Sequence, residues 1–425
     1  MLAALGRRDF SLLWFGGLVS IAGDWVLYAA LPYFVYAETG STVATAGMIA
    51  AELAPGVLLG SVAGVFVDRW DRKRVLVGSN LLQAGVVALL LLVPLGGWLW
   101  LVYAVAAAQS AVAAFSMPAE GALIPALVED KDLVAANALN ALNNRLARLI
   151  GIPVGGTLLG VFGLQPVVAV DCATFVVAAL LIAPIATPGA ARASPAEDDP
   201  TAAVAKSAWA SFWEDWLGGL RLVRRERMIA LIFVVLGLMT FGGTMLDPLD
   251  VAWVRDVLGE GPQVYAWLIT AHAASGIVGT LLVGQYGGTL SPRHLIGCSS
   301  VAAGAALAVK YNVPVLPLAV ALSVFTGATS VVSSVGVETL VQRGVPDEYR
   351  GRVFGSLGAS GALLSLSGAG VGGLLAEVVG IVTMLSVAAG LTVLAGLVVL
   401  VALAGSTGQP VEAKPGRLEP LKRPT

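Results

Sequence analysis

Four charged residues stand inside long apolar stretches of the sequence. Asp24 lies about 14 residues into one stretch and Glu52 about ten residues into the next, while Arg145 and Arg148 share a third. Burial away from water favours the protonated form of a carboxyl group, as a group that binds and releases a proton requires. We interpret Asp24 and Glu52 as candidate proton-coupling residues, with a static salt bridge as the alternative.

The two arginines are the expected partners of these acids. Arg145 and Arg148 are three residues apart, which places them on one face of a helix. A charge at the centre of a bilayer costs at least about 2.5 to 3.5 kcal/mol on insertion scales, so each one requires a partner or a function. We therefore include both arginines in the proton-coupling group and expect Arg145 to pair with Asp24.

Other ionisable residues in the apolar stretches have simpler interpretations. Asp171, Asp247 and Asp250 fall near the outer ends of their stretches, where water solvates a carboxylate. His272 is a lone histidine, for which a structural role is the simpler interpretation. Cys172 and Cys298 fall in separate stretches and give neither a disulfide framework nor a metal-binding spacing. We expect no metal and no cofactor.

The composition predicts an all-α integral membrane protein. Of 425 residues 57% are hydrophobic and 12% are charged, compared with about 25% charged in a typical soluble domain. A helix of about 20 apolar residues spans a hydrocarbon core of about 30 Å, and twelve such stretches recur. The predicted spans are residues 10–36, 42–67, 75–95, 97–125, 134–163, 165–187, 228–253, 262–286, 294–310, 313–342, 351–378 and 380–404.

Basic residues predict the orientation of these spans. If both termini are cytoplasmic, only Arg255 and Lys310 fall in outer connections and only Arg145 and Arg148 lie within a span. The other 21 of the 25 Lys and Arg residues lie on the cytoplasmic side. The first apolar stretch is too long for the hydrophobic core of a cleavable signal peptide. We therefore expect a multi-pass protein of a bacterial-type cytoplasmic membrane, with lipid as its surroundings and no nucleic acid partner.

A glycine pattern occurs twice in the chain. The stretch "LIGIPVGGTLLGVFG" is followed 217 residues later by "LSGAGVGGLLAEVVG", and small residues of this kind allow membrane helices to approach closely. The repeat predicts two pseudo-symmetric halves of six helices, at 1–188 and 228–405. The residues of this helix-packing motif are Gly151, Pro153, Gly155 and Gly156 in the first copy and Gly368, Gly372 and Gly373 in the second.

The segment between the halves has a different character. Residues 189–227 begin with a stretch rich in Pro, Ala and acids, which is typical of a flexible linker. The following residues place Trp209, Trp213 and Trp216 on one helical face, which predicts an amphipathic helix on the membrane surface. Residues 406–425 are expected to form a cytoplasmic tail.

The loop "GVFVDRWDRKRVLV" resembles the motif between the second and third helices of the major facilitator superfamily. The matching residues are Gly64, Asp68, Arg69, Lys73 and Arg74. The resemblance implies that Asp68 latches a cytoplasmic gate against the start of the helix predicted at 351–378. A carboxylate is favoured at a helix N-terminus.

The stretch "PDEYRGRVFGS" supplies Arg350 and Arg352 to the same gating motif. Gly288 stands where the second half would have the equivalent of Asp68, so any latch is one-sided. We also expect Gly64 and Gly368 to lie at close helix contacts. The first glycine pattern is similar to the Gly-Pro-x-x-Gly-Gly motif of proton-coupled exporters, with its proline displaced to Pro153.

The combination of "SIAGDW", "DRWDRKRV", "ALIPALV" and "VPDEYRGRVF" resembles an exporter branch of this superfamily. That branch includes macrolide and multidrug efflux proteins and the enterobactin exporter. The resemblance implies a monomeric secondary transporter that exports amphipathic small molecules by alternating access, in exchange for protons. Export of a siderophore or a lipid is the alternative, although a strongly anionic substrate would require more cationic groups than Arg145 and Arg148.

An enzyme is not expected. The sequence has no Gly-x-x-x-x-Gly-Lys-Ser/Thr phosphate loop for ATP hydrolysis. An intramembrane enzyme would require clustered His, Asp or Ser residues at membrane depth, and the chain has only two histidines, His272 and His294.

Overall fold

The computed structural model describes residues 2–67, 69–186, 226–287, 290–344 and 347–404. These residues form helices joined by short turns, and the described part contains no strand. Twelve helical passes cross the bundle, as the sequence predicts. The expected linker with its amphipathic helix, residues 189–227, lies almost entirely outside the described residues, and so does the expected tail at 406–425.

The first six passes form one half of the molecule, and a short helix α1 (Leu2–Leu5) precedes them. Their bounds are α2 (Arg8–Thr39), α3 (Thr42–Val67), α4 with η1 and α5 (Arg72–Ala88, Leu89–Leu92, Val93–Gly96), α6 (Trp100–Leu127), α7 (Leu133–Phe162) and α8 (Leu164–Ile182). A 3-10 turn, η2 (Asp130–Asp132), precedes α7.

The last six passes form the other half. Their bounds are α10 with the π-helical turn η3 (Arg227–Ala252, Trp253–Val257), α11 (Pro262–Tyr286), α12 (Pro292–Asn312), α13 (Leu316–Gly344), α14 (Asp347–Val379) and α15 (Ile381–Ala402). Gly163 and Gly380 adopt positive φ angles of 80° and 92° where α7 turns into α8 and α14 into α15. Glycine adopts this conformation without the strain that a Cβ would add.

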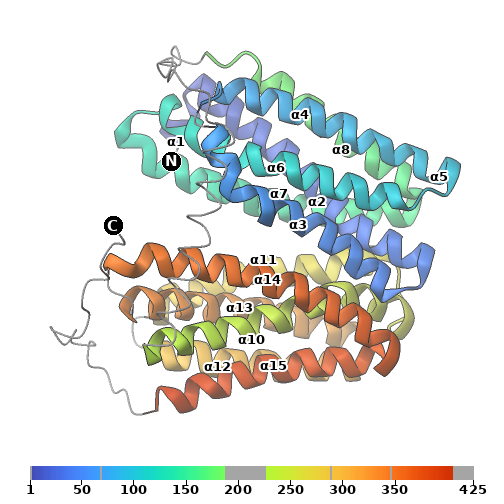
Figure 1. The fold of residues 1–425 in the computed structure, drawn as a ribbon, viewed down its shortest axis with the longest axis vertical. Helices are drawn as coiled ribbons and strands as arrows, with labels where there is room; N and C mark the ends of the chain where they lie inside the picture. Colours follow the sequence, from blue (N-terminus) through green and yellow to red (C-terminus); the bar gives the residue numbers. More distant parts are fainter. Residues whose placement is uncertain (1, 68, 187–225, 288–289, 345–346, 405–425) are drawn as a thin grey trace, which may run out of the picture.

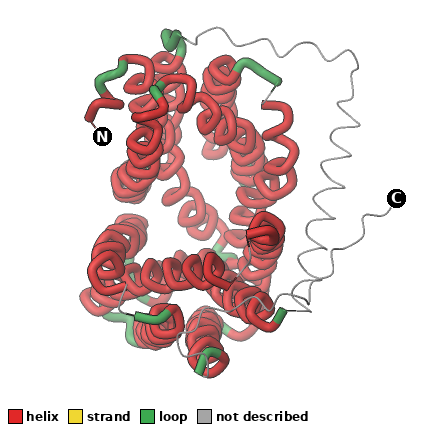
Figure 2. Tube along the Cα trace, turned by 90° about the vertical axis from the view of Figure 1, so that its left-hand side faces the viewer, coloured by secondary structure: helices red, strands yellow, loops and turns green. Residues whose placement is uncertain are grey.

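The two halves lie side by side, with the helices of each running between the same two ends of the molecule (Figure 1). We call the end where α2 begins and α15 ends the terminus face, and the other end the opposite face. In Figure 2, which looks toward the terminus face, the two groups of helices lie above and below each other. The halves join mainly where α7 packs on α11 and α3 packs on α14.

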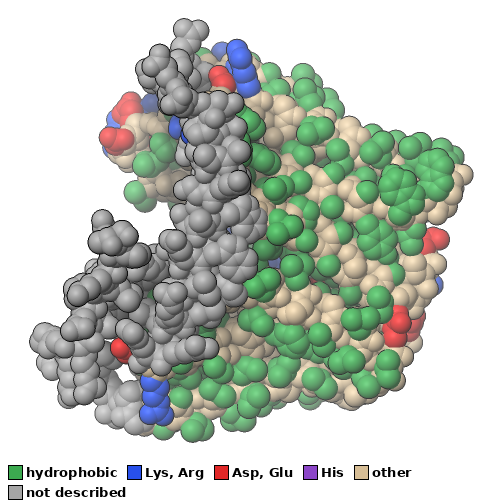
Figure 3. All heavy atoms as spheres, in the orientation of Figure 1, with side chains coloured by type: hydrophobic (Ala, Val, Ile, Leu, Met, Phe, Trp, Pro, Cys, Tyr) green, Lys and Arg blue, Asp and Glu red, His purple; other side chains and the backbone are tan. Residues whose placement is uncertain are grey.

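The flank of the bundle is apolar, as the surface of a membrane protein must be. Figure 3 shows hydrophobic side chains spread over it, while the coloured acidic and basic groups gather toward the two ends. Leu95, Val378 and Val401 are 79%, 81% and 75% exposed, which an aqueous surface would not favour. Eleven described helices are long and apolar enough to cross a membrane. The exception is α12, whose Lys310 and neighbouring polar residues face the protein interior.

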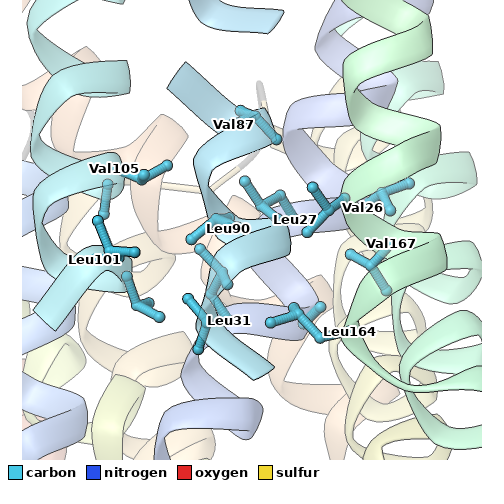
Figure 4. Packing of buried hydrophobic residues seen from close by; sticks show 14 of the residues in the cluster. Val26, Leu27, Leu31, Val87, Leu90, Leu101, Val105, Leu164 and Val167 are labelled. Carbon is cyan, nitrogen blue, oxygen red and sulfur yellow. The ribbon is translucent and has the colours of Figure 1, made fainter. Parts of the chain in front are cut away.

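Each half has its own apolar core. In the first half, Val26, Leu27 and Leu31 of α2 pack against Leu90 of η1 and Val167 of α8 (Figure 4). Interdigitated aliphatic side chains of this kind fix the helices relative to one another within a half. We therefore treat each half as a rigid body when we consider movement between them.

Charged groups fasten the loops at the terminus face. Arg7 and Lys131 both form ion pairs with Glu129, the second at 2.8 Å. Hydrogen bonds from Lys131 and Arg7 lower the pKa of Glu129 to about 2, because both bonds favour its charged form. These pairs tie the start of α2 to the turn between α6 and α7.

Candidate functional site

Four of the repeated glycines bring helices together within each half. Gly151 and Gly155 of α7 face α2, and Gly368 and Gly372 of α14 face α10 in the equivalent way. A Cβ at any of the four would lie 2.1 to 3.0 Å from a backbone oxygen of the neighbouring helix. Pro153 lies within α7 beside them. The glycine pattern therefore sets the closest contact between the fifth and first helices of each half.

The remaining pair of repeated glycines joins the two halves. A Cβ at Gly156 of α7 would lie 2.2 Å from the Cβ of Ala266 on α11. A Cβ at Gly373 of α14 would lie 2.5 Å from the Cβ of Ala46 on α3. Both contacts lie toward the opposite face, and no larger residue fits at either glycine without separating the halves there.

Hydrogen bonds from α2 to η3 and to the turn that follows η3 strengthen this closure. Tyr36 donates its hydroxyl hydrogen bond to the carboxylate of Asp256, and Arg255 donates to the Tyr36 carbonyl at 2.9 Å. The Arg255 guanidinium also lies 5.7 Å from the centroid of the Tyr36 ring. Tyr33 donates to the carbonyl of Glu260 at 3.0 Å. We call this set the α2–η3 lock.

A second set of bonds closes the opposite face between α3 and α14. The Ser41 hydroxyl donates to the Glu377 carboxylate at 2.5 Å. The Thr42 hydroxyl, which is buried, donates to the carbonyl of Gly373 at 2.7 Å. The two halves are therefore held together at the opposite face by two separate hydrogen-bonded contacts.

The terminus face lacks the corresponding glycine contacts within the described part of the chain. Gly64 near the end of α3 has no described atom within 4 Å of an added Cβ, although the sequence predicts a close helix contact there. Gly355, Gly358 and Gly361 near the start of α14 also face open space. In Figure 1 the halves diverge toward the end where the termini lie. Gly64 thus makes no close contact in this conformation, whereas Gly368 does.

The latch that the sequence predicts cannot be placed fully. Asp68 lies outside the described residues, and so do the side chains of Arg350 and Arg352. The helix that Asp68 is expected to meet is α14, which begins at Asp347.

The described residues of the loop after α3 build the start of α4. The Asp71 carboxylate accepts a hydrogen bond from the backbone N–H of Arg74 at 2.9 Å and so caps α4. Arg72 donates to a carbonyl of α6 at 3.0 Å. Arg69 and Arg74 are exposed and Lys73 is half-buried. Capping explains why an acid stands at position 71.

A cavity of about 320 Å³ lies between the two halves. The first half contributes only a few residues to its wall, and the second half contributes most. The residues that carry polar side chains are Tyr28, Arg148, Asp247, Asp250, Tyr265, His272, Ser300, Lys310, Tyr311, Ser323, Thr326, Thr329, Ser330, Ser333 and Thr392. The rest of the wall is apolar and consists mainly of leucine, isoleucine, valine and methionine side chains. We call this space the central cavity.

A buried ion pair forms one wall of the central cavity. Lys310 of α12 lies 3.3 Å from the carboxylate of Asp250 on α10, and Tyr311 donates to the same carboxylate at 2.8 Å. The Lys310 ammonium lies over the rings of Tyr311 and Trp253, at 4.7 and 5.6 Å from their centroids. The side chain of Lys310 is only 8% exposed. The positive charge is thus fixed by one carboxylate and two aromatic rings.

An arginine from the first half lies on the other side of the central cavity. The Arg148 guanidinium lies 4.8 Å from the ring centroid of Trp25, whose ring meets that of Tyr28 edge-on at 4.8 Å. Its buried Nε has no hydrogen-bond partner among the described residues. Arg145 is exposed and does not line the central cavity, so the two arginines have different surroundings.

The expected pairing of acids with these arginines is not formed in this conformation. Between described residues, no ion pair within 4 Å joins Asp24 or Glu52 to Arg145 or Arg148. Asp24 instead interacts electrostatically with Asp171 and Glu52. All three acids lie outside the wall of the central cavity.

The structure corrects the expected positions of four other residues. The sequence places Asp171, Asp247 and Asp250 near water, but Asp171 is fully buried and the other two line the central cavity. It places Lys310 in an outer connection, but α12 continues to Asn312 and buries that side chain. The sequence signal for these cavity acids is their spacing, because Asp247 and Asp250 are three residues apart and so share one helix face.

No group of three or more His, Cys, Asp or Glu side chains is arranged to hold a metal ion in the described part of the chain. The central cavity, with its apolar wall and its hydroxyl and charged groups, is suited to binding an organic molecule between the two halves.

Known proteins share this architecture and this sequence pattern. A transporter of Bacillus subtilis (strain 168) described as MFS-type, YfiS, is 23% identical over 374 residues, which cover 85% of each chain. Macrolide efflux protein A of Streptococcus pyogenes is 25% identical over 381 residues, which cover 88% of this chain and 91% of that protein.

Among solved structures, that of a mutant of the nucleoside transporter NupG superposes with a TM-score of 0.73 at 12% identity and covers 92% of this chain and 99% of its own. At that identity the likeness shows the fold alone. The family model of the Major Facilitator Superfamily matches residues 13–260 and 232–424. The chain is a multi-pass membrane transporter that belongs to the Major Facilitator Superfamily.

Proposed function

We propose that this protein exports amphipathic small molecules from the cell by alternating access, in exchange for protons. The observation that carries the proposal is the central cavity, which lies between two halves that are joined at the opposite face and diverge at the terminus face. A rocking movement of two rigid halves would expose such a cavity to each side of the membrane in turn.

The charges support an orientation of the chain with the terminus face in the cytoplasm. The described residues at this face include Arg7, Arg69, Lys73, Lys131 and Arg293, and excess Lys and Arg is typical of the cytoplasmic side. With the terminus face in the cytoplasm, the conformation corresponds to an inward-open transporter. Substrate would enter the central cavity from the cytoplasm or the inner leaflet.

The wall of the central cavity supports an amphipathic substrate. Aliphatic side chains offer apolar contact, and the hydroxyl groups of α13, among them Thr326, Thr329 and Ser330, offer hydrogen bonds. Asp247 is a cavity carboxylate that takes part in no ion pair with a described residue. A neutral or basic substrate suits this wall. The similarity to a protein named for macrolide efflux supports the same kind of substrate.

Siderophore export is less well supported. An anionic siderophore requires several free cations, and the cavity offers Arg148 and Lys310. Lys310 is already paired with Asp250 at 3.3 Å. The charge of the wall therefore favours the drug-type substrate.

Proton coupling is proposed for the acids of the first half. Asp24 lies about 16 residues, or roughly 24 Å, from the start of α2 and is partly buried. Glu52 of α3 is also partly buried and interacts with it electrostatically. Arg145 and Arg148 of α7 are the cations that we include in the same proposed group of the first half.

The proposed latch at the terminus face belongs to the same cycle. In the outward-open state, Asp68 would meet the start of α14 beside Arg350 and Arg352, and Gly64 would then come into contact. A carboxylate at a helix N-terminus gains roughly 0.3 to 1 kcal/mol, and up to about 2 kcal/mol where partly buried. A contribution of that size is enough to shift a near-balanced equilibrium.

The experiment that tests the proposal is transport in proteoliposomes with an imposed pH gradient. The panel includes a macrolide, ethidium as a fluorescent amphipathic cation, and an anionic catechol siderophore. We expect gradient-dependent transport of the first two and none of the third. Equal transport with and without the gradient would contradict proton exchange, and transport of the siderophore alone would contradict the substrate class.

A further inference from the structure

Asp171 of α8 is a fully buried carboxyl group with an unpartnered oxygen. Its side chain is 0% exposed, and its Oδ2 has no hydrogen-bond partner among the described residues. The Thr174 hydroxyl donates to the backbone carbonyl of Asp171 at 2.7 Å and lies 3.4 Å from the other carboxyl oxygen, Oδ1. A buried polar atom without a partner costs free energy, and the cost is larger for an ionised group. A proton bound at this carboxyl group would lower that cost.

A second carboxyl group lies across the contact between α2 and α8. Gly23 permits the close approach, because a Cβ there would lie 2.4 Å from Oδ1 of Asp171. Asp24 follows Gly23 in α2, and its carboxyl group interacts electrostatically with that of Asp171. Two carboxylates that interact in a low dielectric repel each other when both are ionised, so a single proton between them is favoured. Asp24 and Asp171 are therefore arranged as a pair.

No described basic side chain forms an ion pair with either acid. The ion pairs between described residues include neither Asp171 nor Asp24. Gln109 of α6 lies near the Asp171 carboxyl group, but its buried Nε2 has no described partner in hydrogen-bonding geometry. The other titratable neighbours are Glu52 of α3, which interacts with Asp24, and Cys172, the next residue of α8. The described residues of α4 and η1 present no charged group to Asp171. The nearby charge of α7 is the Arg148 guanidinium, which lies over the ring of Trp25.

The pair is separate from the central cavity. Neither acid lines that cavity, whose own carboxylates are Asp247 and Asp250. The connection between the two places is Trp25, which follows Asp24 and holds the Arg148 guanidinium at the cavity wall. A change of charge on the pair can therefore act on the substrate site through one aromatic ring.

We propose that Asp171 is the second carboxyl group of the coupling site and that it shares a proton with Asp24, apart from the substrate. The inference rests on the proposed function. When the transporter is open to the cytoplasm, the pair carries one shared proton. When it is open to the outside, the pair takes up a second proton. On return, the O–H bond of one acid breaks, the proton passes to water through the partly exposed Asp24, and the pair regains a single negative charge.

The shared proton can be tested without any substrate, by infrared difference spectroscopy of the full-length protein between acidic and alkaline pH. We expect a protonated-carboxyl band that Asp24→Asn and Asp171→Asn each remove or displace, because either substitution breaks the shared pair. Asp130→Asn, at an exposed acid of η2, is the matched control and should leave the band unchanged. Two bands lost one at a time, or a band unaffected by Asp171→Asn, would overturn the inference.

Transport separates this inference from the proposed function. We expect Asp171→Asn to bind ethidium as the unaltered protein does, since Asp171 lies outside the cavity wall, but to lose all gradient-driven accumulation. If the unaltered protein itself ignores the pH gradient, the proposed function fails. If the unaltered protein uses the gradient and Asp171→Asn uses it equally well, only the role of Asp171 fails. Tryptophan fluorescence and thermal unfolding of each variant distinguish loss of coupling from loss of the fold.

Discussion

Removing one hydroxyl group from the α2–η3 lock should open the opposite face. In Tyr36→Phe the aromatic ring remains, but the hydrogen bond to the Asp256 carboxylate is lost. A hydrogen bond to a charged group contributes about 1.5 to 3 kcal/mol, which corresponds to about 10- to 150-fold in an equilibrium constant. Asp256 is exposed, so water replaces part of the lost bond. We therefore expect the low end, about a tenfold shift toward the state that is open at the opposite face.

Spin labels measure this shift directly. Labels at Glu38 on α2 and Val378 on α14, both exposed, report the distance between the halves at the opposite face, after replacement of Cys172 and Cys298. We expect Tyr36→Phe to enlarge the population with the longer distance.

The matched control is Tyr103→Phe. Tyr103 donates to the Ala44 carbonyl at 3.1 Å, so its hydroxyl bond lies within one half. Its removal should leave the distance distribution unchanged. Identical distributions for Tyr36→Phe, Tyr103→Phe and the unaltered protein would refute the reasoning.

Three further predictions address the packing and the charges. Gly156→Ala places a Cβ 2.2 Å from a side chain of the other half, so it should enlarge the long-distance population, which the same labels detect. Lys310→Met leaves Asp250 without its cation at a site where a broken buried pair costs about 3 to 5 kcal/mol. Because Asp250 is 28% exposed and keeps its tyrosine hydrogen bond, we expect Lys310→Met to lower the free energy of unfolding by about 3 kcal/mol. The double variant Lys310→Met/Asp250→Leu should recover this loss, and thermal unfolding measures both. The depressed pKa of Glu129 means that its ion pairs stabilise the fold above its ordinary pKa of 4.5 and that this contribution is lost as the pH falls toward about 2. The difference in melting temperature between the unaltered protein and Glu129→Gln should therefore shrink over that pH range, and a constant difference would contradict it.

The number and placement of the helices could be predicted from the sequence, because the length and apolarity of a membrane span are local properties. The helix α12 does not meet the hydropathy criterion that the other eleven meet, but its apolar stretch was also predicted, at residues 294–310. The repeated glycines also predict close contacts. Gly155 makes its contact within a half, whereas Gly156 makes its contact between the halves. Which glycine faces which neighbour depends on the rotation of α7 about its axis, so it can be determined only from the three-dimensional structure.

The candidate site was predicted less completely, because burial depth depends on where a helix ends. Asp250 was expected near water, but α10 continues through the π-helical turn η3 to Val257 and places this acid inside the bundle. Tyr36 and Asp256 are 220 residues apart, and nothing in a single sequence pairs them. Arg145 and Arg148 share a helix face by spacing, yet only Arg148 reaches the central cavity.

The central claim is that proton movement through the first half drives export from the central cavity, and Asp24→Asn tests it most directly. The amide retains the volume of the carboxyl group but cannot bind and release a proton, and Asp24 does not line the cavity. The measurement is ethidium transport in proteoliposomes with and without an imposed pH gradient, together with ethidium binding. The account predicts that the unaltered protein accumulates ethidium only with the gradient, and that Asp24→Asn binds it equally well but shows no gradient-driven accumulation. Full gradient-driven accumulation by Asp24→Asn would contradict the account.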